Sequence, residues 1–166
     1  MEGSRNGNDL FLKKDHVKRF LGRITLIAAA SALLICSAAG ASKESRAATL
    51  YTHYFNVYMY AAFDKGIREQ NSSIPSTVTA GIRLEIAAIN HFDSKIQTIK
   101  FPSSDKTALN HVLNADAVQT SLDGTLAINT TNTSNYNSLF PGVETAGANS
   151  TAAIDALAKK LGMNWH

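Results

Sequence analysis

Apolar residues recur at steps of three and four along most of the chain after residue 42, the spacing that places them on one face of an α-helix. The clearest run lies between Pro75 and about Lys100; its members are Val78, Ile82, Ile86, Ile89, Phe92, Ile96 and Ile99. This run predicts a helix that turns one apolar seam toward a core. The charged residues of the same segment are expected off that seam: Arg83, Glu85, Asp93 and Lys95.

Three further helices are predicted from similar spacing. The first covers Ser42 to Asn71, where only Gly66 opposes a helix. The third follows a cap at Ser103-Ser104-Asp105 and ends near Ile128; its apolar residues are Leu109, Val112, Leu113, Ala117, Val118, Leu122 and Leu126. The last covers about Val143 to Leu161, after a polar loop that closes with Phe140-Pro141-Gly142.

These helices predict an all-α fold in which an N-terminal membrane or signal helix precedes an antiparallel four-helix bundle. Short connections make successive helices antiparallel neighbours, and a bundle buries four apolar stripes in the simplest way. No segment alternates apolar and polar residues over the length of a strand. About 125 residues follow the N-terminal helix, which is enough for one core.

The N-terminal helix is expected at Ile24 to Ala41, an uncharged stretch of eighteen residues. As a helix it would rise about 27 Å, close to the roughly 30 Å hydrocarbon core of a bilayer. Three fates remain open for it. It is a retained transmembrane anchor, a signal peptide cleaved after Ala41 at the small-residue site Ala39-Gly40-Ala41, or a lipoprotein signal acylated on Cys36. Acylation favours a small residue before the cysteine, and Ile35 stands there instead. All three fates place residues 42–166 outside the cytoplasmic membrane.

Charge divides the chain at the same stretch. Residues 1–23 hold six basic and three acidic side chains, whereas residues 42–166 hold ten of each. The basic excess therefore belongs to an N-terminal tail that is expected to stay in the cytoplasm. A nucleic-acid-binding domain would carry that excess on its folded part. We therefore expect no nucleic-acid partner, and contact with the membrane through the N-terminal helix.

No group of residues predicts catalysis or a cofactor. The single cysteine, Cys36, leaves residues 42–166 without a disulfide or a thiolate metal site. Three histidines, His53, His91 and His111, are candidates for a metal site, but none has the spacing of a di-metal bundle motif. No nucleophile elbow and no phosphate-binding glycine loop occurs. The sequence thus predicts a protein that is not an enzyme and that holds no metal.

A concentration of aromatic residues, YTHYFNVYMY, is the candidate contact surface for a ligand or partner. Its rings are Tyr51, Tyr54, Phe55, Tyr58 and Tyr60. Tyrosine suits such a surface because its ring is apolar and its hydroxyl is polar, although the same rings can form an internal packing stripe. We therefore expect a non-enzymatic, membrane-anchored protein that acts by binding or structural association at the cell envelope, with an envelope protein or a small apolar ligand as its partner.

Two alternative functions remain open. One is an envelope ligand-binding protein or lipoprotein with an apolar cavity between helices, near Phe63 and Phe92. The other is a pilin-like subunit, in which a basic leader ending in glycine precedes a long apolar helix. Gly22 fits that leader, but Ile27 stands where pilins have a glutamate.

Four segments of the second half are similar to segments of a known type of protein: FDSKIQTIKFP (residues 92–102), LNADAVQTSLDGTLA, NYNSLF and a closing ALAKKLGM. Over about 80 residues they resemble a recurrent type of actinobacterial exported protein, which has a membrane or lipoprotein signal followed by a helical domain. The resemblance implies the same fold and an extracytoplasmic location. Its motifs are packing motifs, so it adds no catalytic residue.

Overall fold

The computed structural model describes residues 46–163, which form an antiparallel four-helix bundle. The first helix of the bundle is continuous and contains a wider, π-helical segment. The elements are α2 (Arg46–Tyr54), the π-helical η1 (Phe55–Tyr60), α3 (Ala61–Gln70), α4 (Pro75–Ile96), the short 3₁₀ turn η2 (Ser103–Asp105), α5 (Lys106–Ala127) and α6 (Thr133–Lys160). The predicted all-α, antiparallel four-helix architecture is confirmed.

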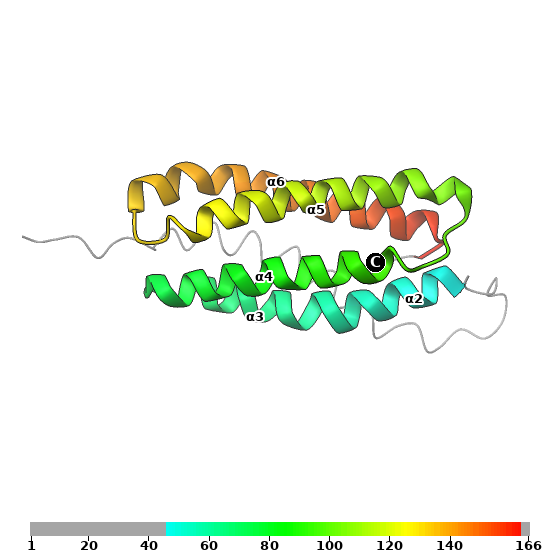
Figure 1. Cartoon of the computed structure of the whole chain (residues 1–166), viewed down its shortest axis with the longest axis horizontal. Helices are drawn as coiled ribbons and strands as arrows, with labels where there is room; N and C mark the ends of the chain where they lie inside the picture. Colours follow the sequence, from blue (N-terminus) through cyan, green and yellow to red (C-terminus); the bar gives the residue numbers. More distant parts are fainter. Residues whose placement is uncertain (1–45, 164–166) are drawn as a thin grey trace, which may run out of the picture.

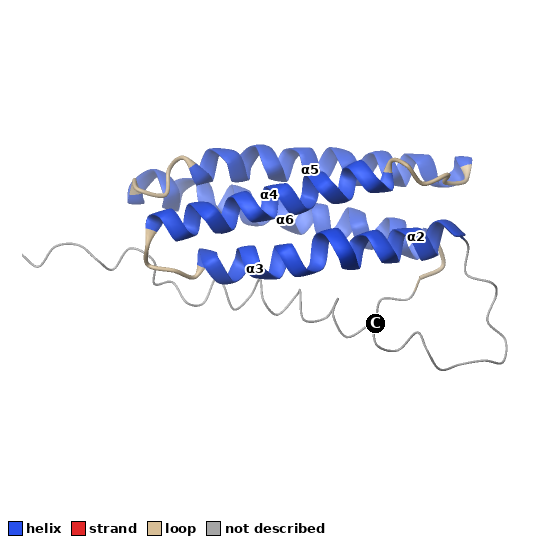
Figure 2. Cartoon of the chain, turned by 60° about the horizontal axis from the view of Figure 1, so that its bottom comes forward, coloured by secondary structure: helices blue, strands red, loops and turns tan. Residues whose placement is uncertain are grey.

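The helices form two layers, each made of one hairpin (Figure 1). The first hairpin consists of α2, η1 and α3 packed against α4, and the second consists of α5 packed against α6. The hairpins meet mainly where α4 packs on α5. Within residues 46–163 every regular element is helical (Figure 2).

The N-terminal stretch Ile24 to Ala41 lies outside the described residues. Its three fates, anchor, cleaved signal or acylated Cys36, therefore stay predictions. Among the helices of residues 46–163, none combines the length and the apolar character needed to cross a bilayer.

Helix α6 begins at Thr133, well before the predicted start near Val143, so the predicted loop there was wrong. The Asn132 side chain caps the helix by accepting a hydrogen bond from the Asn135 N–H at 3.1 Å. Tyr136 is buried and its ring stacks on Phe140 at 5.8 Å between centroids. Pro141 lies inside the helix and removes one backbone donor. The buried Tyr136 and the partly buried Phe140 pack the first turns of α6 against the smaller apolar cluster at this end of the bundle.

The predicted seams of α4 and α5 were partly wrong. The apolar spacing predicts Glu85 off the seam of α4, but this side chain lies on the seam and is only 4% exposed. Ile86, which the spacing predicts on the seam, is only partly buried. In α5 the predicted face included Val118, which is 55% exposed. The interior positions in the middle of this helix are instead held by polar residues: Asp116, Gln119 and Asp123.

These polar residues lie between two apolar clusters. The larger cluster fills the end of the bundle formed by α2, η1, the second half of α4, the first half of α5 and the end of α6, and contains Tyr51, Phe92, Val112 and Leu157. The smaller one, at the opposite end, contains Val78, Ile82, Leu126, Ala127 and Tyr136. The core is therefore interrupted by a polar layer near its middle.

The first hairpin closes on two glycines that face each other. A methyl group at Gly81 would lie 2.5 Å from the Gly66 carbonyl oxygen and 2.9 Å from the Gln70 nitrogen. A methyl group at Gly66 would lie 2.7 Å from the Gly81 carbonyl oxygen. Helices α3 and α4 therefore touch through their backbones, which a side chain at either position would prevent.

We expect Gly81→Ala to lower the free energy of unfolding by about 1–3 kcal/mol, because the added methyl forces the helices apart. Gly124→Ala is the matched control, since a methyl group at this α5 position meets nothing within 4 Å. It should raise stability by up to about 1 kcal/mol through helix propensity. Chemical denaturation of the two variants measures both effects, and equal stabilisation by the two substitutions would contradict the close helix contact.

Candidate functional site

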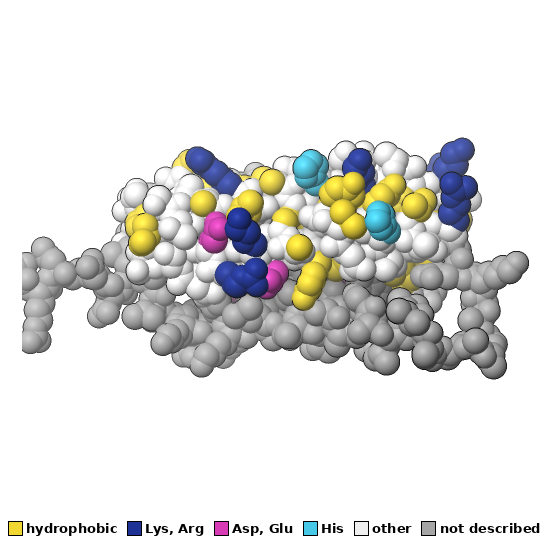
Figure 3. Space-filling view, turned by 90° about the horizontal axis from the view of Figure 1, so that it is seen from below, with side chains coloured by type: hydrophobic (Ala, Val, Ile, Leu, Met, Phe, Trp, Pro, Cys, Tyr) yellow, Lys and Arg dark blue, Asp and Glu magenta, His cyan; other side chains and the backbone are white. Residues whose placement is uncertain are grey.

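A row of rings crosses the outer surface of the first hairpin. We call it the aromatic row; its members are His53, Tyr54, Tyr58 and His91, with Lys95 over the Tyr58 ring. Neighbouring ring centroids lie 5.7, 6.0 and 5.9 Å apart in that order. The Lys95 ammonium lies 5.5 Å from the Tyr58 centroid, within cation–π range. Hydrophobic and histidine side chains gather on this face of the molecule (Figure 3).

The five predicted contact residues divide between the core and the surface. The Tyr51 ring is fully buried and meets Phe92 edge-on at 5.5 Å, and the Phe55 ring meets Phe92 at 5.8 Å. Tyr54 and Tyr58 are half-buried in the aromatic row. The π-helical segment contributes to this division, because its wider turns bring the steps of four from Tyr51 to Phe55 to Met59 onto one buried side.

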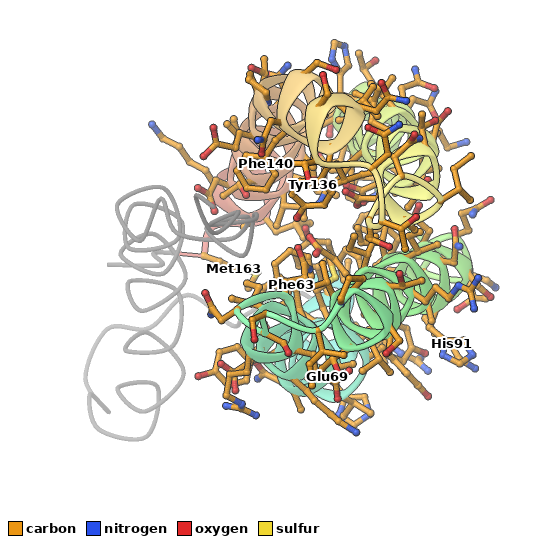
Figure 4. All side chains as sticks on the ribbon, turned by 90° about the vertical axis from the view of Figure 1, so that its left-hand side faces the viewer. Phe63, Glu69, His91, Tyr136, Phe140 and Met163 are labelled. Atoms are coloured by element: carbon orange, nitrogen blue, oxygen red, sulfur yellow. The ribbon has the colours of Figure 1, made fainter. Side chains whose placement is uncertain are left out.

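Tyr60, the fifth predicted residue, is 37% exposed and lies beside a small cavity rather than in the aromatic row. The two sides of the first hairpin differ accordingly. Phe63 points into the bundle, whereas His91 points away from it (Figure 4). The predicted residues therefore do not form one exposed patch, and their role as a contact surface stays a prediction.

The interior holds a second candidate site, which we call the carboxyl layer: Glu85 and Asp93 of α4, and Asp116 and Asp123 of α5. Glu85 accepts hydrogen bonds from both sides. The Gln70 amide of α3 donates to it at 2.7 Å, and the Gln119 amide of α5 donates at 3.0 Å. Asp123 lies near enough to Glu85 for the two charges to repel.

The other two carboxyls face each other across the two hairpins. Asp93 and Asp116 lie close enough together for a side-chain hydrogen bond, which would require a proton on one of them. The Ser150 hydroxyl of α6 donates to one oxygen of Asp116. One oxygen each of Asp93, Asp116 and Asp123 is buried without a fixed donor. A buried unpaired charge is costly, so these groups favour their neutral forms.

Burial is the largest cause that raises the pKa of each carboxyl in the layer. Burial and the neighbouring Asp123 raise the pKa of Glu85 to about 8, despite the two amide donors. Burial raises the pKa of Asp123 to about 7. Burial and the Asp116 carboxyl raise the pKa of Asp93 to about 8. Burial also raises the pKa of Asp116, so the shift has the same direction in all four carboxyls of the layer.

A cavity of about 50 Å³ lies between the first helix and α6, next to the carboxyl layer. Its apolar wall includes Phe55, Met59, Phe63 and Ile154, and its polar wall includes Gln119 and Ser150. Sites for drug-sized ligands have volumes of about 300–1,000 Å³, whereas this space suits one or two water molecules. This small space touches Phe63 but not Phe92, and the ligand-sized apolar cavity stays a prediction.

The three candidate metal-binding histidines lie on different helices and are all exposed. His53 and His91 are joined by the two tyrosines of the aromatic row, whereas His111 lies on α5. Among residues 46–163, no group of three or more His, Cys, Asp or Glu side chains has the arrangement of a metal site. The carboxyls of the layer fall into two facing pairs, Glu85 with Asp123 and Asp93 with Asp116.

Comparison of the chain with protein-family models, with curated proteins and with solved structures found no match.

Ser150→Ala should lower the free energy of unfolding at pH 7 by about 1–3 kcal/mol, because Asp116 loses its hydroxyl donor inside the bundle. Ser138→Ala is the matched control: this serine lies on the same helix, is exposed, and bonds its own helix backbone at Asn135. Its effect should stay within about 0.5 kcal/mol. Urea denaturation of both variants compares the losses, and equal losses would argue against a structural role for the Ser150 hydroxyl.

Proposed function

We propose that this chain is a non-enzymatic, membrane-anchored extracytoplasmic bundle that associates with the cell envelope through the aromatic row. The proposed occupant of the row is the headgroup region of the anchoring membrane. The observation that carries the proposal is the composition of the row: half-buried tyrosines beside two histidines and a lysine, on the outer face of the first hairpin.

The chemistry of these side chains suits a membrane–water interface. Tyrosine is enriched there because its ring enters the apolar boundary while its hydroxyl stays hydrated. Lys95 adds a positive charge on a long apolar stem, which can approach anionic headgroups. Val57, 52% exposed in the same π-helical segment, adds apolar surface.

The order of the chain supports the same occupant. Only residues 42–45 separate the expected anchor, Ile24 to Ala41, from the start of α2 at Arg46. Tyr54 and Tyr58 follow within about 18 Å of helix length. Two tyrosines of the row thus belong to the helix that follows the proposed anchor directly.

Small-ligand binding is the second candidate function, and the cavity beside Phe63 favours it. An apolar wall of phenylalanine, methionine and isoleucine would accept a small apolar group. A volume of about 50 Å³ limits that ligand to a few atoms unless the helices move. Membrane association is the stronger proposal, since it requires no rearrangement.

The anchor is tested by the mass of the mature protein in membrane and secreted fractions. We expect the membrane form to retain the uncleaved stretch Ile24 to Ala41, with an unmodified Cys36. A secreted form that starts at Ser42 would contradict the anchor. A lipid mass on Cys36 would show that an acyl chain anchors the protein in place of a transmembrane helix. The domain would then still lie on the same side of the membrane.

The surface contact is tested with the full-length chain in vesicles that contain anionic lipid and a lipid whose headgroup carries a fully chelated gadolinium ion, which histidine does not bind. Spin labels are placed at Ser94→Cys, beside the row on α4, or at Ser121→Cys on α5, in a Cys36→Ser background; both serines are exposed. We expect stronger relaxation of the label at position 94, because that face lies on the headgroups.

Replacing both Tyr54 and Tyr58 by alanine should bring the relaxation at position 94 down to that at position 121. Comparable relaxation at the two positions in the unsubstituted chain would reject the membrane surface as the occupant. An intact difference that does not depend on the two tyrosines would reject the row as the contact.

A further inference from the structure

The carboxyl layer brings acids of the two hairpins together. Glu85 and Asp93 belong to the first hairpin, and Asp116 and Asp123 belong to the second. The Gln119 amide donates to Glu85 across the two hairpins, and Asp93 lies beside Asp116. Each acidic group of one hairpin thus faces an acidic group of the other.

The remaining groups around the layer do not offset these acids. The first helix presents Gln70 and the buried Tyr51, whose hydroxyl donates to the Ile154 carbonyl at 3.3 Å. Helix α6 presents Ser150, Tyr136 and Asp155; Asp155 acts on Tyr51 as a further negative charge. On α3, Arg68 and Lys65 pair with acids of their own helix at the surface, at Asp64–Arg68 and Lys65–Glu69.

We propose that the carboxyl layer is a proton-operated latch between the hairpins: protons hold α4 against α5, and their loss charges both sides of that contact and loosens the bundle. The inference does not rest on membrane association, since it concerns the interior alone. It follows from facing carboxyls, buried oxygens without donors and the lack of a facing cation in the described bundle.

The direction of the effect follows from proton linkage. The pKa values of Glu85 and Asp93 rise from their ordinary values near 4 to about 8, so the folded bundle holds more protons than the unfolded chain between these limits. Stability is therefore fully present at about pH 4 and falls as the pH rises toward 8. Each unit by which a pKa is raised corresponds to about a tenfold change in the folding equilibrium.

The small cavity provides a route for water to the layer. Gln119 and Ser150 line it and also bond Glu85 and Asp116, respectively. Water in this space reaches side chains that are one hydrogen bond away from both halves of the layer. Protons can thus exchange without full separation of the hairpins.

The first test is chemical denaturation of the full-length chain in neutral detergent at several pH values. We expect the unfolding equilibrium constant to rise at least about 100-fold between pH 5 and 8.5. Glu85→Gln should reduce that rise at least about tenfold, because an amide cannot ionise. Asp64→Asn, on the α3 surface, is the matched control and should leave the rise within about twofold.

The second test measures the separation of the hairpins, so that a variant with altered stability still gives an answer. Spin labels at Val57→Cys and Ser121→Cys, both exposed and on opposite hairpins, report their distance in the Cys36→Ser full-length chain. We expect the distance distribution to lengthen or broaden from pH 6 to pH 9 and to return on acidification. A fourfold amide variant, which combines Glu85→Gln with Asp93→Asn, Asp116→Asn and Asp123→Asn, should not respond.

Three outcomes would overturn the latch: an unchanged distribution from pH 6 to pH 9, an equal response of the fourfold amide variant, or a Glu85→Gln chain with the full pH dependence of stability. Restoration of the short distance at pH 9 by Ca²⁺ or K⁺ alone would also overturn it, because a cation rather than protons would then neutralise the layer.

Discussion

Neutralisation of buried carboxyls is the constraint on which the rest of the bundle depends. Four acids occupy the contact between the hairpins, and burial raises the pKa of each. No cation of the described residues faces these acids, so protons neutralise them. The Gln70 and Gln119 amides also donate hydrogen bonds to Glu85. Ser150 of α6 lines the small cavity beside this layer. The two apolar clusters then close the bundle at either end.

Hydrophobic spacing was sufficient to predict four antiparallel helices, because each helix carries at least one clear apolar stripe. It was insufficient for the middle of the core. Glu85 and Ile86 are neighbours, and a reading that places apolar residues inside selects Ile86. The steps Val78, Ile82, Glu85, Ile89 and Phe92 would have found the true seam, but only with a neutral glutamic acid allowed in the interior. The start of α6 depends on burial of Tyr136 against residues that are distant in the sequence. Pro141 favours a helix boundary in the sequence, so the earlier start could not be recognised from local residues.

The aromatic concentration in the first helix serves the interior and the surface at once. The composition alone identified the aromatic segment. It could not show which rings are buried and which are at the surface, because that depends on the helix register. The π-helical turns of η1 alter that register within the cluster. Tyr51 and Phe55 consequently pack on Phe92, while Tyr54 and Tyr58 join His91 outside. The surface row is held in place by rings of the same segment that are fixed in the core.

The glycine contact between α3 and α4 also determines how this bundle can move. A slide of one helix along the other by a single turn would bring larger side chains to the place where Gly66 meets Gly81, and the backbones could no longer touch. The glycine contact therefore favours one alignment of α3 on α4. A movement between the two halves of the bundle that keeps this contact would take place at the boundary with α5 and α6.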